Sequence, residues 1–405
     1  MDALKAIFWV SFLLIFYAYA GYPALMWSLC FAGRTFRRRG GGGGAPARAT
    51  GFRPPVTIVI SAYNEEDAID GKIRNTLALR YPRGLLEIIV VSDGSDDRTD
   101  EIVKNYRGRV LLRRFEGRIG KSACLNEVVP GAAGEIVVFS DANSMYEEGS
   151  VESLVENFSD PRVGFVTGFT KYARPARDPK PGARAVQNNP DAAGIGLYSL
   201  LEKLTKAAES RIGSCVGADG AIFAIRKRLY RPLDNADIND LVIPLGIVRE
   251  GYRGVLAERA FCVEEAPDDA GRQVRITART LRAVFRNSDL LNPARHGIFS
   301  FEFFSHKFCK LSVPFPGAAL FFSSLALAIR SGAPFGGTYG AVLLAQAAFI
   351  VFGSISGFMG GRGNGPFSRY GSFCHSFLAA NLSVLLGWLK FLRGENFITW
   401  VTARR

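Results

Sequence analysis

The chain has 405 residues, is 48% hydrophobic and carries a net charge of +13, from 50 Lys and Arg against 37 Asp and Glu. This length allows one large domain or two smaller ones with full cores, and the basic surplus indicates nucleic acid, anionic lipid or a phosphorylated substrate as partner. Its six cysteines include no CxxC pair, which excludes a disulfide scaffold and a zinc site and fits a reduced, cytoplasmic location for the middle of the chain.

Four stretches of the chain contain no Asp, Glu, Lys or Arg, and each is about long enough to cross a hydrocarbon core, which needs roughly 20 residues. They are Ala6–Gly33, Leu311–Ile329, Ser331–Gly361 and Tyr370–Leu389. The first is too long and too aromatic for a signal peptide, so we predict an N-terminal transmembrane anchor over residues 1–35. The other three predict a C-terminal membrane region of two to three spans over residues 313–392. Buried helices of a soluble protein are the alternative, which the recurrence of such runs disfavours.

A basic, glycine-rich segment follows the anchor and is predicted to be a linker over residues 36–53. Its five consecutive glycines, Gly40–Gly44, neither follow a strand nor open a helix, which argues against a phosphate-binding loop. The arginines Arg37–Arg39 favour the inner membrane surface by the positive-inside tendency. We therefore expect a multi-pass protein of the cell membrane, in contact with membrane lipids, whose central domain is cytoplasmic and binds no nucleic acid.

Strands alternate with helices from residue 54 to about residue 290, which predicts an α/β domain with a mostly parallel sheet covered on both faces. The expected strands are Val56–Tyr63, Glu87–Asp93, Arg109–Arg113 and Glu135–Asp141. The expected helices include Asn64–Leu79, with Asn64 as its N-cap, and Lys121–Val129.

Polar side chains stand where three of these strands end, and ligands of such sheets bind at the carboxyl ends of the strands. The ends carry Ala62 to Glu65, Asp93 to Ser95 and Asp141 to Asn143. Asp141 and Asn143 offer oxygen ligands to Mg²⁺ or Mn²⁺, and Lys121, at a loop-to-helix junction, suits phosphate oxygens. Each residue alone could be an ordinary turn residue, but together they favour a nucleotide-diphosphate site. The sequence has no GxGxxG or GxxxxGK[ST], which argues against a Rossmann dehydrogenase or a P-loop NTPase.

Two further motifs follow, each with a structural alternative. Gly217 and Gly220, in VGADG, either permit the close approach of a ligand or form a plain turn. Asp240, in INDLVIPL, either stabilises the dipole of an apolar helix or acts as general base toward an acceptor hydroxyl.

The last part of the domain predicts contacts with the membrane surface. Four arginines at 3-4-3 spacing form one helical face, with the first two expected to point inward and the last two toward lipid headgroups. They are Arg272, Arg275, Arg279 and Arg282. An interfacial amphipathic helical segment containing His306 and Lys307 is expected over residues 291–312, before the next span.

Together these motifs resemble the family 2 membrane glycosyltransferases, the group that contains cellulose, hyaluronan and poly-N-acetylglucosamine synthases. The resemblance covers about Pro54 to Pro314 and is carried by VTIVISAYNEE, VVSDGSDDRT, GKSACLNE, FSDANS, VGADG and INDLVIPL, in that order. It implies a Rossmann-like nucleotide-sugar-binding domain of the GT-A type beside transmembrane helices. It also implies a nucleotide-sugar donor, most often UDP-linked, and Mg²⁺ or Mn²⁺.

The resemblance also implies roles for individual residues. Nucleotide binding falls to Ala62, Tyr63, Glu65, Asp93, Lys121, Arg272 and Arg275. The metal falls to Asp141 and Asn143, and acceptor binding to Gly217, Ala218, Asp219 and Gly220. Asp240 becomes the catalytic base of an inverting displacement.

Two departures from the family pattern bear on the product. The metal motif reads DAN, so Asn143 is a neutral ligand or holds ribose or a water instead. The QxxRW motif of processive members is replaced by RQVRI, from Arg272 to Ile276, which lacks the glutamine and the tryptophan. We therefore expect transfer of a sugar to a growing glycan or a lipid-linked acceptor in cell-envelope or exopolysaccharide synthesis, with a single-sugar lipid transferase as the alternative.

The sequence gives less support to other classes of protein function, and the topology of the C-terminal region is left open. A transporter would need ionisable residues in its spans, where His375 is the only candidate apart from cysteine and tyrosine. An inactive nucleotide-sugar binder is disfavoured by the retained acidic and basic motif residues. Three C-terminal spans would put the basic tail over residues 393–405 outside, against the positive-inside tendency, so one run need not cross. The need for a partner subunit is left open.

Overall fold

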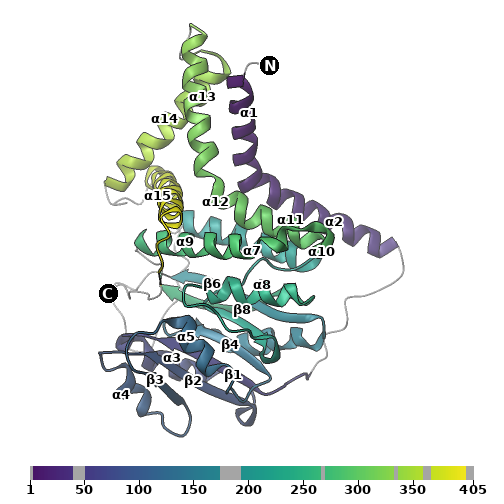
Figure 1. Ribbon diagram of the computed structural model, residues 1–405, viewed down its shortest axis with the longest axis vertical. Coiled ribbons are helices and arrows are strands. Elements are labelled where there is room, and N and C mark those ends of the chain that lie inside the picture. Colours follow the sequence, from purple (N-terminus) through teal and green to yellow (C-terminus); the bar gives the residue numbers. More distant parts are fainter. Residues whose placement is uncertain are drawn as a thin grey trace.

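The computed structural model describes residues 3–39, 51–173, 193–265, 270–332, 336–358 and 366–397. An α/β domain forms one end of the molecule and a group of upright helices forms the other (Figure 1). Helices α7 (Ala193–Ile212) and α9 (Ala270–Arg286) lie between the two parts. The glycine run Gly40–Gly44 and the tail beyond residue 397 lie outside the described residues.

The described part of the α/β domain contains one eight-stranded sheet in the order β3-β2-β1-β4-β7-β6-β8-β5. The strands are β1 (Val56–Ala62), β2 (Leu86–Asp93), β3 (Leu111–Phe115), β4 (Ile136–Asp141), β5 (Met145–Tyr146), β6 (Val163–Ala173), β7 (Ile222–Arg226) and β8 (Arg253–Glu265). Strand β7 runs antiparallel to both of its neighbours and β5 runs antiparallel to β8, while the other pairs are parallel. The predicted α/β class and mostly parallel sheet are confirmed.

Both faces of the sheet are buried, as the near-continuous apolar strands predict. Along β1, Ile58 and Ile60 belong to one core and Val59 to the other. The first core includes Ile73 and the second includes Leu125, which come from helices on opposite faces. The helices of the domain are α3 (Glu66–Leu77), α4 (Thr99–Lys104), α5 (Lys121–Val128), α6 (Ser150–Val155) and α8 (Asn239–Arg249).

The predicted N-cap of α3 is wrong by one residue. Helix α3 begins at Glu66 with Glu65 in the N-cap position, and Asn64 adopts a left-handed backbone conformation with φ 51°. The Asn64 Oδ1 atom accepts a hydrogen bond from the Asp96 amide at 2.8 Å. This side chain therefore joins two loops and does not cap the helix.

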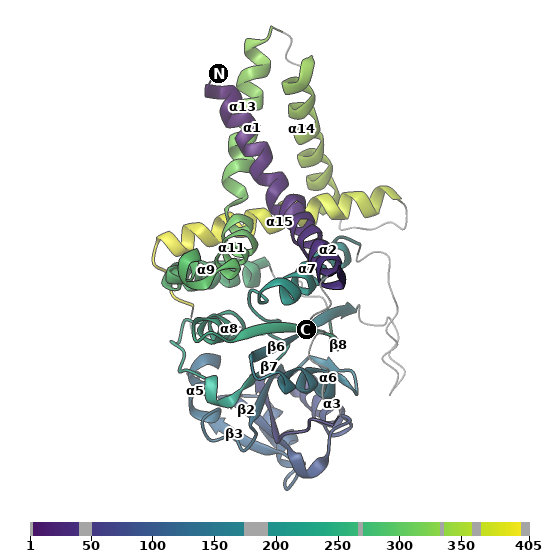
Figure 2. The same cartoon turned by 90° about the vertical axis from the view of Figure 1, so that its right-hand side faces the viewer.

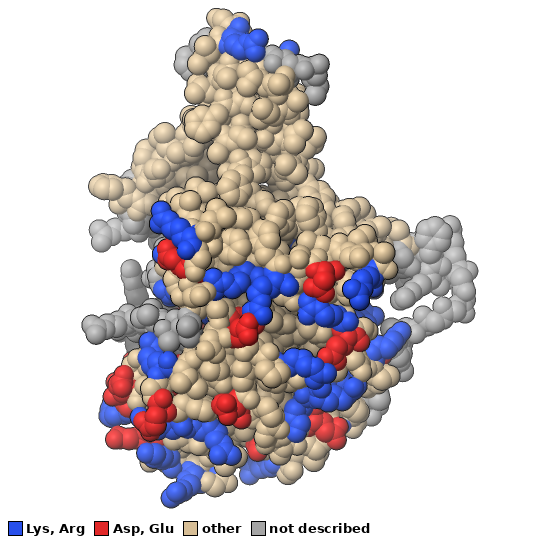
Figure 3. All heavy atoms as spheres, viewed as in Figure 1, with Lys and Arg blue, Asp and Glu red and all other residues tan. Residues whose placement is uncertain are grey.

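The apolar runs form the upright helices and one helix that lies across them. The helices of these runs are α1 (Ala3–Phe16), α2 (Tyr22–Arg39), α13 (Pro314–Arg330), α14 (Gly337–Phe358) and α15 (Pro366–Leu392). Within the part of the chain that the structure describes, three helices are long and apolar enough to cross a membrane, namely Ala3–Ala32, Gly337–Phe358 and Tyr370–Leu392. A fourth candidate combines Ile298–Ser312 and Pro314–Arg330, which meet at a bend of 53°. On the face shown in Figure 3, charged side chains gather on the α/β domain and almost none lie on the upright helices, apart from a small basic group near the tip.

Helix α15 runs nearly perpendicular to α1, α13 and α14, which stand upright in Figure 2. Its C-terminal half packs on α9, where the rings of Phe285 and Phe391 stack at 5.2 Å. A Cβ on Gly387 would lie 2.5 Å from Cγ2 of Thr277, so the two helix backbones approach closely there. The Trp388 indole donates to the Leu311 carbonyl at 2.7 Å. These contacts attach α15 to the layer above the α/β domain.

Replacing Gly254 of β8 by alanine should destabilise the fold. A Cβ at this position would lie 1.9 Å from the ring of the fully buried Phe165, so the ring must move within a packed core. We expect a loss of about 1–3 kcal/mol or more in the free energy of unfolding, measured by denaturant titration in detergent. As a control, Gly246→Ala in α8 meets no atom within 4 Å and should stabilise by about 0.5–1 kcal/mol. Equal stability of the two variants would contradict this account.

Candidate active site

The predicted site residues gather at one edge of the sheet. Strands β1, β2 and β4 end there, at Ala62, Asp93 and Asp141. Strand β7 runs antiparallel to β4, with Ile222 paired to Ser140, so Ala221 comes to lie beside Asp141. The glycine motif that precedes β7 is thereby placed next to the predicted metal motif, although the two are far apart in the sequence.

The loops that follow β1 and β2 are bonded into one surface. The Asn64 amide donates to Ser95 Oγ at 3.2 Å, and the Glu65 amide donates to Thr99 Oγ1 at 2.8 Å. The Arg118 guanidinium lies over the Tyr63 ring, with its Cζ 3.6 Å from the ring centre. The structure therefore brings Ala62, Tyr63 and Glu65 together at the edge where a nucleotide base is predicted to bind.

Asp93 is directed inward and holds the loop before α5. It is 1% exposed, and its Oδ1 accepts hydrogen bonds from the Ile119 and Gly120 amides at 2.8 and 3.1 Å. Gly94 has φ +69°, and a Cβ on it would lie 2.6 Å from the Gly117 carbonyl oxygen, so only glycine fits. The carboxylate thus shapes the loop that presents Lys121, and its direct contact with a nucleotide stays a prediction.

Lys121 and Asp141 form an ion pair. The Lys121 ammonium, in the first turn of α5, lies 2.5 Å from Oδ1 of Asp141 at the end of β4. The sequence assigned the lysine to a diphosphate and the aspartate to a metal ion. Because the two side chains meet, the two predicted ligand groups neutralise one another's charge in this structure.

The protein ligands for a metal ion are few. Among the described residues, no group of three or more His, Cys, Asp or Glu side chains gathers as a metal centre. Asp141 and Asn143 supply oxygen atoms from a partly exposed turn. This pair does not fit a structural metal site, but it fits Mg²⁺ or Mn²⁺ that completes its shell with substrate phosphates and water.

Two buried charges behind this turn were not predicted. Lys72 of α3 is fully buried, donates to the Ser144 carbonyl at 2.5 Å and lies 3.9 Å from the centre of the Tyr146 ring. Glu264 of β8 accepts a hydrogen bond from Ser144 Oγ. A signal was available, because Lys72 shares one helical face with Ile69, and such a face is normally apolar.

These burials shift both pKa values toward neutrality. Burial lowers the pKa of Lys72 from its ordinary 10.5 to about 7. Burial, together with the neighbouring Asp141, raises the pKa of Glu264 from 4.5 to about 7. The turn that carries Asp141 and Asn143 is therefore held from behind by two groups whose charges depend on pH.

The glycine motif contacts Asp240 directly. The Ala218 amide donates to the Asp240 carbonyl at 2.7 Å, and a Cβ on Gly220 would lie 3.0 Å from Asp240 Oδ2. Gly217 has φ +80°, which a larger residue rarely adopts. The Asp240 carboxylate forms no hydrogen bond or ion pair with any residue that the structure describes. In contrast, the Asp219 carboxylate accepts from the Thr170 amide at 2.8 Å, so it shapes the turn.

The arginine face of α9 is placed differently from the prediction. Arg279 donates to the Ala236 carbonyl at 3.0 Å and to the Asp237 carbonyl, in the loop before α8. Its predicted contact with lipid headgroups is therefore wrong, because its guanidinium contacts the loop before α8. Arg272 is exposed and Arg275 is partly buried, both in the first turns of α9.

Comparison with known sequences identifies the domain. Residues 57–231 match the model of a family described as "Glycosyl transferase family 2". This segment is a family 2 glycosyltransferase domain. It overlaps the sheet-edge motifs from Ala62 to Gly220, and Asp240 and α9 lie beyond it.

Two curated relatives each match less than a third of the chain. The poly-beta-1,6-N-acetyl-D-glucosamine synthase of Staphylococcus aureus (strain MSSA476) is 34% identical over 117 residues, which are 28% of either protein. The beta-monoglucosyldiacylglycerol synthase of Trichormus variabilis is 36% identical over 121 residues, which are 29% of this chain and 26% of that protein. The matched segments thus span less than a third of these relatives.

A solved structure shows the same fold. The mannosyltransferase PcManGT from Pyrobaculum calidifontis, solved in complex with GDP-Man and Mn²⁺, superposes with a TM-score of 0.64 and 23% identity. The alignment covers 97% of this chain and 100% of that one. The glycosyltransferase domain therefore has the predicted GT-A fold.

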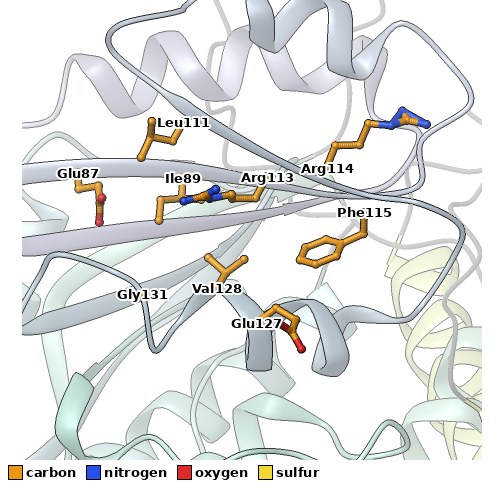
Figure 4. Close-up of a pocket in the computed structure, with 9 residues that line it drawn as sticks. All are labelled: Glu87, Ile89, Leu111, Arg113, Arg114, Phe115, Glu127, Val128 and Gly131. Carbon is orange, nitrogen blue, oxygen red and sulfur yellow. The ribbon is translucent and has the colours of Figure 1, made fainter.

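One cavity of the glycosyltransferase domain lies away from the sheet edge. It measures about 390 Å³ and is lined from β2, β3 and the α5 region by residues that include Glu87, Ile89 and Glu127 (Figure 4). Arg114 turns away from the other lining residues and pairs with Asp100 at 2.7 Å. None of the predicted site residues lines this cavity, so we do not assign it to the donor.

Replacing Lys72 by methionine should remove part of the pH dependence of stability. Between pH 7 and 10 the unfolded chain holds a proton on Lys72 that the folded chain has released, so the stability of the native protein should rise with pH. In Lys72→Met this rise should be absent, as measured by unfolding at several pH values.

A matched variant tests the other buried charge. Glu264 binds its proton more tightly in the folded state, so stability should fall as pH rises from 4.5 to 7. Glu264→Gln should lose this fall and keep the alkaline rise. Parallel curves for the native protein and Lys72→Met above pH 7 would show that Lys72 does not titrate as described.

Proposed function

We propose that the chain is an inverting membrane glycosyltransferase that transfers a sugar from a nucleotide-sugar donor to a hydroxyl group of a glycan or lipid-linked acceptor. The carrying observation is the pairing of β7 with β4, which brings the Asp141 motif beside the glycine motif that touches Asp240. Donor groups and a base then share one edge of the sheet. The setting that we propose is cell-envelope or exopolysaccharide synthesis, and the relative named as a polysaccharide synthase supports it.

The donor is held by the strand-end residues. Ala62, Tyr63 and Glu65 form the surface for the nucleotide, and Asp93 keeps in place the loop that presents Lys121. Arg272 is among the charges that act on Glu264, behind the turn that carries Asp141, and we propose that Arg272 and Arg275 bind phosphate oxygens of the donor. Mg²⁺ or Mn²⁺, held by Asp141 and Asn143, would neutralise part of the charge on the diphosphate. The donor could carry UDP, or GDP as in the solved mannosyltransferase.

Asp240 is the general base. Its carboxylate would take the proton of the acceptor hydroxyl, whose oxygen forms a bond to the anomeric carbon of the donor sugar. The bond from that carbon to the diphosphate oxygen breaks, and the diphosphate leaves toward Lys121 at the N-terminus of α5. Attack opposite to the leaving group inverts the configuration at the anomeric carbon.

Either a polymer or a single transfer is compatible with the relatives, since one is named as a polysaccharide synthase and the other as a glycolipid synthase. The RQVRI segment favours single transfer, because the first turns of α9 offer Ile276 where processive members carry a tryptophan that would stack near the acceptor sugar.

We further propose that α1, α13 and α14 cross the membrane and that α15 lies in its plane on the side of the glycosyltransferase domain. Support comes from the orientation of α15 in Figure 2 and from its packing on α9. Arg282 of α9 donates to the Glu395 carbonyl at 3.1 Å, which holds the end of α15 at that level. Lys390 and Arg393 then face the cytoplasm, in agreement with the positive-inside tendency.

Asp240→Asn should abolish transfer while leaving the donor site intact. Loss of a general base lowers turnover by about 10²- to 10⁴-fold. The measurement is release of nucleoside diphosphate from a panel of nucleotide sugars, with the full chain in native-like membrane and Mg²⁺ or Mn²⁺. Nucleotide binding, measured by calorimetry, should be unchanged.

The control for this variant is Asp70→Asn, which removes a carboxylate on the exposed face of α3 that pairs only with its neighbours Arg74 and Tyr106. It should retain full activity. Wild-type turnover by Asp240→Asn would refute its role as base, and the size of the product would separate polymer synthesis from single transfer.

Epitope tags attached to the two ends of the chain should be detected on opposite sides of the membrane. If α1, α13 and α14 cross the membrane and α15 does not, an N-terminal tag faces outward and a C-terminal tag faces the cytoplasm. The measurement is antibody access in intact and permeabilised cells. A C-terminal tag that is accessible in intact cells would mean that α15 crosses.

A further inference from the structure

A single buried carboxylate joins the membrane helices to the acceptor side of the site. Glu209 of α7 is 0% exposed, and its Oε1 accepts a hydrogen bond from the Tyr22 hydroxyl at 2.6 Å. The same oxygen lies 2.6 Å from Nδ1 of His306, and Oε2 accepts from the Val216 amide at 3.3 Å. Tyr22 opens α2 and Val216 directly precedes the glycine motif, so three distant segments meet on one side chain.

Two more carboxylates complete this network. Glu302 of α11 (Ile298–Phe303) is fully buried and accepts from the Ser214 amide at 3.2 Å. Glu202 of α7 lies 2.7 Å from Nε2 of His306 and accepts from the Lys310 ammonium at 2.8 Å. Glu302 Oε1 is buried without a hydrogen-bond partner, whereas both oxygens of Glu202 and Glu209 are bonded, so the pairs around His306 fix its ring in one arrangement.

The segment that carries His306 is a π-helix over Phe304–Cys309, a wide turn often found at functional sites. With His306 held by two carboxylates, the next residue, Lys307, is directed to the catalytic side. Its Cε lies 3.8 Å from where a Cβ on Gly217 would stand, and Asp240 is among the charges that act on it. The Lys307 ammonium forms no hydrogen bond or ion pair with any described residue.

A second ammonium group lies nearby. Lys206 of α7 is 9% exposed, and it too forms no hydrogen bond through its side chain and no ion pair within the described ranges. The two lysines lie close enough to repel one another, and Asp219 of the glycine motif is among the charges that act on Lys206. Glu202 is the charge that acts most strongly on both lysines, but neither ammonium lies within hydrogen-bond or ion-pair distance of a described carboxylate. Both therefore keep N–H donors for an added anion.

We propose that Lys307 and Lys206 form the binding site for a phosphate group in the headgroup of a membrane lipid acceptor, placed next to Asp240. This inference rests on the proposed glycosyltransferase function and narrows its acceptor to an anionic, phosphate-bearing lipid. The lysines come from α7 and from the helix that leads into the membrane, which is the side from which a lipid headgroup would enter (Figure 1). The donor diphosphate is assigned to Lys121 in the first turn of α5, so the two phosphate sites use different lysines.

The test is equilibrium binding to the purified full chain in a neutral detergent, which needs no turnover. The probes are short-chain phosphatidic acid, the matching diacylglycerol, inorganic phosphate and UDP. The native protein should prefer phosphatidic acid to diacylglycerol, and Lys307→Met should weaken phosphatidic acid binding by about 10- to 100-fold, the loss expected for a charge-assisted contact. Lys307→Arg should bind within a few-fold of the native protein, and UDP binding should be unchanged in both.

Lys203→Met is the matched control. Lys203 lies on α7 close to Lys206, and its ammonium is 3.6 Å from the centre of the Phe169 ring. Its replacement should leave phosphatidic acid binding unchanged. If Lys307→Met does not retain the native melting temperature, Lys307→Gln replaces it, since it also removes the charge.

Four results would overturn the proposal. They are equal affinity for phosphatidic acid and diacylglycerol, no effect of Lys307→Met, an equal loss in Lys203→Met, or inorganic phosphate binding as tightly as the lipid. Weaker UDP binding in Lys307→Met would instead assign this lysine to the donor. None of these binding measurements involves sugar transfer. A negative result in them would refute the lipid site without bearing on the proposed reaction, and a negative result for Asp240→Asn would refute the reaction without bearing on lipid binding.

Discussion

The antiparallel pairing of β7 with β4 is the constraint on which the rest of the site depends. Parallel strands alone would have left the glycine motif at the opposite edge of the sheet, because a parallel β7 would begin where β4 begins. Reversing β7 puts its start, at Ile222, beside Ser140 and the end of β4. Tyr146 secures this junction, since its hydroxyl donates to the carbonyls of Phe139 and Ala221. Donor and acceptor motifs therefore meet through backbone pairing, before any side chain binds a ligand.

Buried charges hold the loops that carry these motifs. Lys72 and Glu264 contact the turn that follows Asp141, while Glu209 and Glu302 bind the amides that precede Gly217. Desolvating a charged side chain is unfavourable, so hydrophobic residues at these positions would often be as stable or more so. Their placement at the two loops of the site, and not at random in the core, supports a role in positioning the loops.

Helices α9 and α7 each contact an apolar helix on one side and a loop of the candidate site on the other. Helix α9 supports α15 on one side, through Phe285 and Thr277, and the loop before Asp240 on the other, through Arg279. Helix α7 binds Tyr22 on one side and the glycine motif on the other. A displacement of α2 or α15 would therefore be transmitted to both sides of Asp240 through these contacts.

The sequence by itself determined the α/β class, the strands from Val56 to Asp141, the apolar helices and the motifs at the strand ends. These features depend on local periodicity and on residue types that suit turns, phosphates or metal ions, so they can be read along the chain. Even the family could be recognised in this way. The N-cap at Asn64 and the outward direction of Arg279 were mistaken, because both side chains bond to segments distant in sequence.

Only the tertiary structure decided which residues act together. The pairing of Lys121 with Asp141, the burial of Lys72 and the position of Asp240 beside Gly220 all depend on the register between strands and on helix packing. The orientation of α15 was equally undetermined, since an apolar run is compatible with crossing a membrane or lying along it. Such relations arise from contacts between residues far apart in the chain, and the periodicity of a sequence reports only on residues close together in it.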